Sequence, residues 1–280
     1  MDYQIEKVRT DDKSLEEIRE LLNISFPQAT KFSLEYLTEQ YRDNPVGEIV
    51  GFNAYKDGQL AAHYVTMPVY MTISGEKVKG LLSLNTATHP EHRGKRLFSI
   101  LAKQTYDYAK ENGYAFVIGV ANANSIHGFI KNLGFAFVSK LDVKWGWGKI
   151  DEKEREKKVF SMCWDKETLG WRLKDKQYYD RKGMVFGKYK NLPMIKTLMG
   201  VLPKELLRES RVREGGRSWL RPFNLYVGLG ADLGKGHYYN FPKFVKHSPF
   251  NLIFLDLTDG RLPKVTKENI FFQLLDFDVA

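Results

Sequence analysis

Hydrophobic and polar positions in the first third of the chain alternate between helical and strand periodicity. Apolar residues recur three and four positions apart after Ser14 and again after Ser33, which predicts two amphipathic helices. The sequence SLEE at residues 14–17 predicts a capping box at the start of the first helix. Three strand-like runs follow at residues 48–55, 60–72 and 79–88, separated by the turn signals KDG and SGE. These runs predict an antiparallel meander.

The third strand leads into a basic turn and then into another helix. Residues 93–96 read RGKR, and apolar residues then recur at helical spacing from Leu97 until Gly113. A strand over residues 114–120 follows, which completes a β-α-β unit. We expect its two strands to lie side by side and parallel, with a cleft where they splay apart.

The basic turn predicts a phosphate site. The first N–H groups of a helix have no partner inside it, and the helix dipole there stabilises an anion by roughly 0.3–1 kcal/mol. Arg93, Lys95 and Arg96 add positive charge, and Gly94 allows unusual backbone torsions and close approach of a ligand oxygen. A diphosphate would fit this turn; a solvated basic turn is the alternative interpretation of these residues taken alone.

A second helix follows the strand at residues 114–120. The sequence ANANS leads into it, and we predict Ser125 as its N-cap and Gly134 as its end. The apolar positions of this helix follow the i, i+3, i+4, i+7 rule: Ile126, Phe129, Ile130 and Leu133.

These two segments resemble motifs of the GNAT acetyltransferase superfamily. RGKRLF at residues 93–98 is similar to motif A, usually written Q/R-x-x-G-x-G/A, although Arg96 and Phe98 replace both of its glycines. KNLGF at residues 131–135 is similar to the end of motif B. The resemblance covers roughly residues 1–147. It implies an α+β fold with a mixed α/β sheet, of the GNAT type in the N-terminal half.

The resemblance also implies that acetyl-coenzyme A (acetyl-CoA) is the cofactor and acyl donor. Its diphosphate would lie on the basic turn, and its pantetheine arm would follow the end of the strand at residues 79–88. The cofactor-binding residues so implied are Thr86, Thr88, Arg93, Gly94, Lys95, Arg96, Leu97, Phe98 and Asn124.

One departure from the superfamily concerns the proton donor. The superfamily often places a tyrosine five residues before the final phenylalanine of motif B, where it protonates the departing thiolate, but this chain has Ile130 there. Isoleucine cannot donate a proton. Another group or water must do so, or the chemistry is not acyl transfer.

The proton acceptor is open as well. An ammonium group must lose a proton before it attacks a thioester, and a carboxylate, a histidine or a water chain usually takes it. The strand at residues 79–88 contains no carboxylate, so His63 is the first catalytic candidate, and Asp278 with Asp276 is the second. The structural alternatives are a satisfied histidine within the sheet and aspartates that protect a sheet edge.

The chain changes character near residue 150. A highly charged run at residues 149–158 suggests a boundary, which gives one domain at residues 1–150 and another at residues 151–280. Beyond it we predict strands at residues 184–190, 222–229, 249–257 and 270–279 and helical stretches near 192–210. This order suggests a second, degenerate GNAT-like half, as in tandem members of the superfamily, that walls off the acceptor pocket.

Composition limits the kinds of molecule that the chain is expected to bind. With 43 basic against 34 acidic residues the net charge is +9, which favours anionic partners such as coenzyme A, a nucleic acid or an acidic membrane. The basic clusters are dispersed, so we do not expect a nucleic acid. Cys163 is the single cysteine, which excludes an intramolecular disulfide and a cysteine-based zinc site, and we expect no metal. No segment approaches a membrane span and the N-terminus is polar, so we expect a cytoplasmic protein without a membrane partner.

Three functions remain in play. The leading hypothesis is an N-acyltransferase that moves an acetyl group from acetyl-CoA to the amine of a small molecule or amino sugar. The second is an aminoacyl transferase of the type that builds peptidoglycan bridges. The third is a catalytically silent acyl-CoA-binding module. The sequence leaves the acceptor, the acyl length and the oligomeric state open.

Overall fold

The computed structural model describes residues 2–150, 152–174, 178–187, 194–215, 221–234, 236–241 and 248–277. Its helices are α1 (Asp12–Ser25), α2 (Leu34–Tyr41), α3 (Leu97–Glu111), α4 (Ile126–Leu133), α5 (Lys166–Arg172) and α6 (Lys204–Glu209), with 3-10 turns at η1 (Pro90–His92), η2 (Glu152–Glu154) and η3 (Leu274–Asp276). The strands are β1 (Gln4–Lys7), β2 (Val50–Lys56), β3 (Gln59–Ile73), β4 (Glu76–Thr88), β5 (Phe116–Ala121), β6 (Ala136–Lys140), β7 (Asp142–Trp147), β8 (Phe160–Met162), β9 (Tyr179–Arg181), β10 (Met184–Gly187), β11 (Ile195–Val201), β12 (Phe223–Leu229), β13 (His237–Asn240), β14 (Asn251–Asp256) and β15 (Ile270–Gln273).

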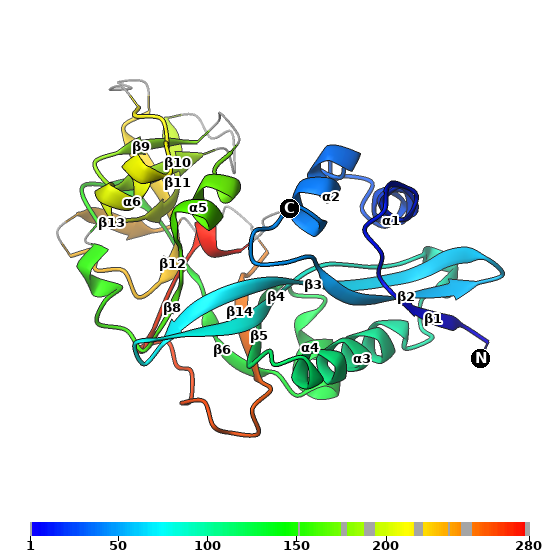
Figure 1. Ribbon diagram of the computed structural model, residues 1–280. Helices are drawn as coiled ribbons and strands as arrows, with labels where there is room; N and C mark the ends of the chain where they lie inside the picture. Colours follow the sequence, from blue (N-terminus) through cyan, green and yellow to red (C-terminus); the bar gives the residue numbers. More distant parts are fainter. Residues whose placement is uncertain are drawn as a thin grey trace.

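The N-terminal part is a twisted sheet with helices on both faces. Strands β2 to β4 pair as an antiparallel meander and β4 then pairs with β5 in parallel, as we predicted, and β1 adds to the edge by pairing with β2. Helices α1 and α2 lie on one face of this sheet and α3 and α4 on the other (Figure 1). Each helix buries one apolar stripe against the sheet, for example Leu15 and Ile18 of α1 and Leu101 of α3, all fully buried.

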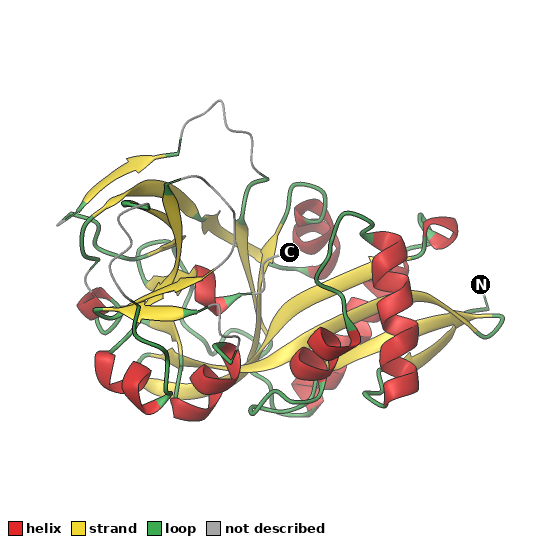
Figure 2. Ribbon diagram, turned by 90° about the horizontal axis from the view of Figure 1, so that it is seen from above, coloured by secondary structure: helices red, strands yellow, loops and turns green. Residues whose placement is uncertain are grey.

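Strands from the two parts of the chain pair with each other. Strand β14 lies between β5 and β6, with Ile253 opposite Gly119 of β5. Strand β7 leaves in the other direction and pairs with β12 and β13. Strand β8 pairs with the end of β3, and β15 joins β8 to β12, so the strands form one continuous path (Figure 2). The division near residue 150 stays a prediction, and strands pair across it in both directions.

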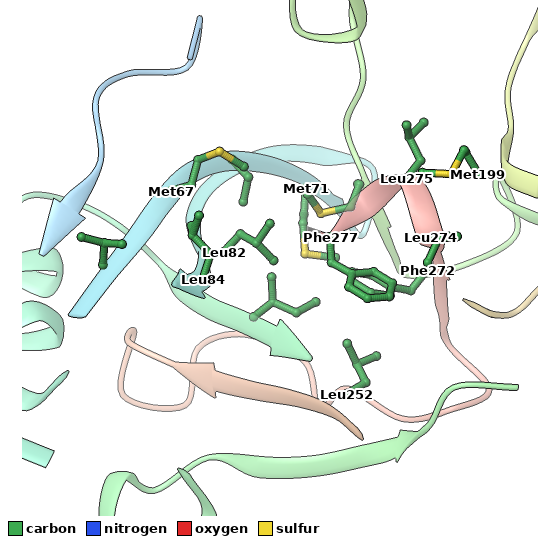
Figure 3. Close-up of a cluster of buried hydrophobic side chains, with 14 of the residues drawn as sticks. Met67, Met71, Leu82, Leu84, Met199, Leu252, Phe272, Leu274, Leu275 and Phe277 are labelled. Atoms are coloured by element: carbon green, nitrogen blue, oxygen red, sulfur yellow. The ribbon is translucent and has the colours of Figure 1, made fainter. Parts of the chain in front are cut away.

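A common hydrophobic core lies where these strands meet. It joins side chains of β3, β4, β11, β14 and β15 with those of the C-terminal 3-10 turn (Figure 3). The ring of Phe277 stacks on Phe272 of β15, with ring centroids 5.6 Å apart. The core therefore includes residues from both the N-terminal and the C-terminal part, such as Leu82 of β4 and Leu274, both at most 2% exposed.

The C-terminal part repeats an order of elements found in the N-terminal part. Strands β9, β10 and β11 form an antiparallel meander, and α6 then connects β11 to the parallel strand β12. The same order occurs in β2, β3, β4, α3 and β5. The tandem relation remains a prediction. Part of the predicted helical stretch near residues 192–210 is wrong, because residues 195–201 form the buried strand β11.

One predicted helix cap is wrong, and another lacks its side-chain hydrogen bond. Helix α1 begins one turn earlier than SLEE suggested, since the side chain of Asp11 accepts hydrogen bonds from the backbone N and the hydroxyl of Ser14. Ser125 is the N-cap residue of α4 as predicted, but its side chain makes no capping hydrogen bond; Gly134 ends α4 in the left-handed conformation as expected. Ser33 does cap α2, by accepting from the backbone N of Tyr36. Among the described helices, none combines the length and the apolar character that a membrane span needs.

The shared strands predict that both parts of the chain unfold together. Ile118→Ala in β5 removes a fully buried side chain and should cost about 2–5 kcal/mol of unfolding free energy. All five tryptophans lie at residue 145 or later, so tryptophan fluorescence reports mainly on the C-terminal part and on β7, which pairs with it. We expect urea transitions followed by fluorescence and by far-ultraviolet circular dichroism to shift together in this variant. Ile100→Ala, at a 43% exposed position on α3, is the control and should shift neither. A fluorescence transition unmoved by Ile118→Ala would contradict the coupling.

Candidate functional site

A cleft of about 870 Å³ opens where β4 and β5 part. In the described residues these strands pair only at Leu81 with Val117 and at Leu82 with Ile118. Beyond this point the cleft is lined by β4 from Ser83 onward and by the end of β5. The backbone edges that face each other there have no strand partner across the gap.

A β-bulge in β4 accounts for the parting of the strands. The pairing of β4 with β3 shifts between Val65 opposite Leu84 and His63 opposite Ala87, so Asn85 and Thr86 together face a single residue of β3. Asn85 has a φ of 37°, in the left-handed region that asparagine tolerates better than most residues. A bulge bends its strand, and here the bend follows directly on the last pairing with β5.

The basic turn leaves the start of α3 uncapped. Gly94 has a φ of 76° and Arg96 a φ of 60°, and no side chain caps the helix. Among the described groups, none accepts a hydrogen bond from the N–H groups of residues 94–99; the first helical bond runs from Ile100 to Arg96. A Cβ built on Gly94 would have no atom within 4 Å. The turn therefore presents a row of open amides in a cationic setting.

Asn122 holds the loop that leads into α4. The side-chain oxygen of Asn122 accepts hydrogen bonds from the backbone N of Asn124 at 2.9 Å and of Ser125 at 3.0 Å. Both helix starts lie at the cleft, and only that of α3 carries the basic residues of the turn at 93–96. Sequence reasoning did not assign a role to Asn122. The signal was its position in ANANS, two residues before Asn124 and three before Ser125, whose backbone N–H groups donate to it.

The predicted cofactor residues fall into two groups. Thr86, Thr88, Arg93, Phe98 and Asn124 line the cleft. The Nε of Arg93 also donates to the carbonyl of Thr88 at 3.4 Å, which ties the turn to the end of β4.

The other predicted residues belong to the turn itself. Gly94 and Arg96 are exposed and Lys95 is partly exposed. Leu97 is buried at 2% exposure in the core beneath the sheet, so only its backbone is open to a ligand.

Phe98 stands where the motif A pattern has a glycine, and α4 compensates for its size. Its ring packs edge-on against Phe129, with centroids 5.1 Å apart. It also lies so close to Gly128 that a Cβ there would come within 3.0 Å of the ring. The small residue is thus on α4 and the large one on α3.

His63 lies in the core of the sheet and not in the cleft. It is fully buried, its Nε2 lies 3.0 Å from the hydroxyl of Tyr41 and its Nδ1 2.7 Å from the side-chain oxygen of Asn53. Burial lowers the pKa of this imidazole to about 3. Because both ring nitrogens of His63 already have hydrogen-bond partners, neither is open to the proton of an acceptor amine. The geometry therefore favours a structural histidine within the sheet.

Of the two candidate aspartates, Asp276 lies within the described residues and Asp278 does not. Asp276 is buried, accepts from Trp164 Nε1 and from the backbone N of Gln273, each at 2.8 Å, and holds the last 3-10 turn. Burial raises its pKa to about 6, against the charges of Arg155 and Arg172. Asp278 lies outside the described residues, and its catalytic role stays a prediction.

A chain of hydroxyl groups reaches the cleft near α4. Ser83 lines the cleft, its hydroxyl lies 3.1 Å from that of Tyr64, and Tyr64 bonds in turn to Tyr106. Burial raises the pKa of Tyr64 to about 12, so this phenol stays protonated. Ile130, at the usual tyrosine position, packs partly buried against the core beneath the sheet.

Asn85 is a second residue that sequence reasoning missed. It lines the cleft at the bulge, and its buried Nδ2 has no hydrogen-bond partner among the described groups. A buried amide without a partner costs free energy, so a molecule in the cleft that supplies an acceptor oxygen would satisfy it. An asparagine in the middle of a β-branched and leucine-rich run was the sequence signal.

Charge in the cleft is cationic. Among the described lining residues, Lys31 and Arg93 are charged and none is a carboxylate or a histidine. In the described ranges, no group of three or more His, Cys, Asp and Glu side chains is arranged to hold a metal ion.

Comparison with known proteins finds a family model that matches the N-terminal part of the chain. Residues 6–138 match the family model described as acetyltransferase (GNAT) domain. No curated protein matches the chain.

Solved structures share the fold over both parts of the chain. A GCN5-related N-acetyltransferase from Kribbella flavida has a TM-score of 0.60 at 12% identity, over 91% of this chain and 73% of that one. A protein from Enterococcus faecalis V583, described as a probable N-acyltransferase, has a TM-score of 0.59 at 11% identity, over 92% and 73%. Eis1 from Mycobacterium abscessus has a TM-score of 0.59 at 10% identity, over 91% and 74%. At these identities the likeness shows the fold alone, and it confirms the predicted fold class, whereas the predicted superfamily is supported by the family model that matches residues 6–138.

The environment of His63 predicts a pH dependence of stability. The pKa of His63 in the folded chain, about 3, lies below the ordinary 6.5. Below pH 6.5 His63 is therefore protonated in the unfolded chain but stays neutral in the folded chain until the pH nears 3. The stability due to this group is present above pH 6.5 and is lost as the pH falls toward 3, at up to about 1.4 kcal/mol per pH unit. Urea unfolding at pH 7, 6, 5 and 4 should therefore show a steeper decline in the wild type than in His63→Gln. Asp276 contributes with the opposite sign, equally in both proteins. Parallel declines would contradict the buried neutral state.

Proposed function

We propose that this chain, whose residues 6–138 match the acetyltransferase (GNAT) domain, transfers an acetyl group from acetyl-CoA to the amine of a small molecule. The observation that carries the proposal is the row of open amides at residues 94–99 beside the cleft between β4 and β5. With this function goes the cytoplasmic location that we expected from the sequence.

The residues present fit coenzyme A. The open amides, the vacant space around Gly94 and the side chain of Arg93 suit a diphosphate. The edge of β4 at Thr86 and Thr88 offers backbone groups to an extended, amide-containing arm. When bound, acetyl-CoA supplies a carbonyl carbon activated as a thioester.

The chain's own contribution is to position the reactants and exclude water. Holding two reactants in place can supply on the order of 7–11 kcal/mol, which exceeds the 10²- to 10⁴-fold effect of a single acid or base. The bulge at Asn85 places a side-chain amide and unpaired backbone groups where they can donate to an oxygen of the substrate. The described lining holds hydroxyl and amide groups but no carboxylate or imidazole, so within that lining water is the carrier for the amine proton.

Two measurements test the function directly. Acetyl-CoA at about 100 times its dissociation constant should stabilise the protein by about 2.7 kcal/mol, a rise in melting temperature of about 5 °C or more. Thiol release in the presence of primary amines should then follow. A thermal shift without thiol release from any amine would favour the silent binding module, and a shift with aminoacyl transfer RNA alone would favour the aminoacyl transferase.

A substitution in the turn tests the phosphate site. Gly94→Asp places a carboxylate next to the open amides and should abolish the thermal shift caused by acetyl-CoA. Gly75→Asp is a matched control: Gly75 also has a positive φ and open surroundings, but lies at the far end of the β3–β4 hairpin. Both variants should carry a similar cost of the left-handed backbone, about 1–2 kcal/mol, while Gly75→Asp keeps the shift. An undiminished shift in Gly94→Asp would exclude the turn as the diphosphate site.

A further inference from the structure

We infer that the acceptor is a monoamine on an apolar, aromatic body, an arylalkylamine, and neither an amino sugar nor a polyamine. The inference rests on the proposed function and concerns the end of the cleft that faces α1 and α2. Residues of α3 and α4 line the cofactor end. These two helices lie on the opposite face of the sheet from α1 and α2 (Figure 1).

Phenylalanine rings from distant parts of the chain line this end of the cleft. Phe26 and Phe32, from the segment between α1 and α2, lie with ring centroids 5.9 Å apart. Phe250 and Phe277, from the C-terminal part, lie with centroids 6.0 Å apart. Two ring pairs on one cleft give an aromatic guest edge and face contacts from both walls.

Phe26 is the most open of these rings. It is 39% exposed, whereas Phe32 and Phe277 are at most 6% exposed. A large apolar side chain left open at the rim of a cleft gains from a guest that covers it. Phe26 follows directly after α1, so its position is fixed by the helix and little ordering is needed on binding.

Charge at the cleft disfavours acceptors with several ammonium groups. Lys31 and Arg93 are the charged residues of the described lining, and both are cationic. A second ammonium group would be desolvated there without a carboxylate partner among these residues. The single amine that reacts becomes neutral before attack, so an acceptor with one amine avoids this cost.

Competing acceptors test the inference in the full-length protein. With acetyl-CoA as donor, we expect kcat/KM for 2-phenylethylamine to exceed that for glucosamine and for spermidine by at least about tenfold. Phe26→Ala should lower kcat/KM for 2-phenylethylamine by about five- to tenfold through KM, and Phe26→Leu by less. Calorimetric binding of 2-phenylethylamine to the protein loaded with coenzyme A, where no transfer occurs, should weaken in parallel. Ile24→Ala is the matched control, since Ile24 is 51% exposed on the same helix and outside the described lining.

The outcomes separate this inference from the proposed function. A preference for glucosamine or spermidine, or an unchanged KM and amine affinity in Phe26→Ala, would overturn the inference alone. The same holds if Phe26→Ala changes only the preference between acetyl-CoA and octanoyl-CoA, because the rings would then hold an acyl chain. Loss of the proposed function would show differently, as no thermal shift with acetyl-CoA and no thiol release with any amine.

Discussion

The site depends on the point at which β4 and β5 stop pairing. If the two strands stayed paired to their ends, their facing backbone groups would be satisfied by each other and no cleft would form. They part after Leu82 and Ile118, and the bulge at Asn85 bends β4 away at that point. Each strand then leads into a helix, so the same parting brings two helix starts to one gap. The basic residues of the turn at 93–96 make the start of α3 the more favourable of the two for an anion, because their charge adds to that of its open amides.

The exchange of strands between the two parts of the chain forms the other wall of the cleft. Because β14 lies beside β5, the residues just before it, Ser248 to Phe250, come to the cleft. Phe277 arrives from the other side of the core, stacked on Phe272 of β15. The proposed cofactor end is thus built within residues 1–150, while the proposed acceptor end needs side chains from more than a hundred residues further along. An acceptor pocket of this kind has no local sequence signature.

Local rules accounted for much of the N-terminal part and failed where a long-range contact decided. The turn signals placed β2, β3 and β4, and Ser33 and Gly134 marked helix ends, because these features depend on neighbours within four residues. The role of His63 depends on Tyr41 and Asn53, which lie 22 and 10 residues away, and periodicity does not reveal such partners. In residues 195–201 the apolar side chains Ile195, Leu198 and Met199 recur at helical spacing, and burial between β10 and β12 makes the segment a strand. The start of α1 was misplaced because Asp11 and Ser14 are both good caps.

The departures from the glycine pattern of motif A show how geometry persists when residues change. Arg96 adopts the left-handed backbone that a glycine would take, at a cost of about 1–2 kcal/mol, and so keeps the amides after it turned outward while adding a charge. Phe98 is larger than the glycine of the pattern. Gly128 of α4 has no side chain and so leaves room for the ring of Phe98. The first change moves strain into the backbone and the second moves a small residue to the opposite helix. Both leave the row of open amides at the start of α3, which is the feature that an anion recognises.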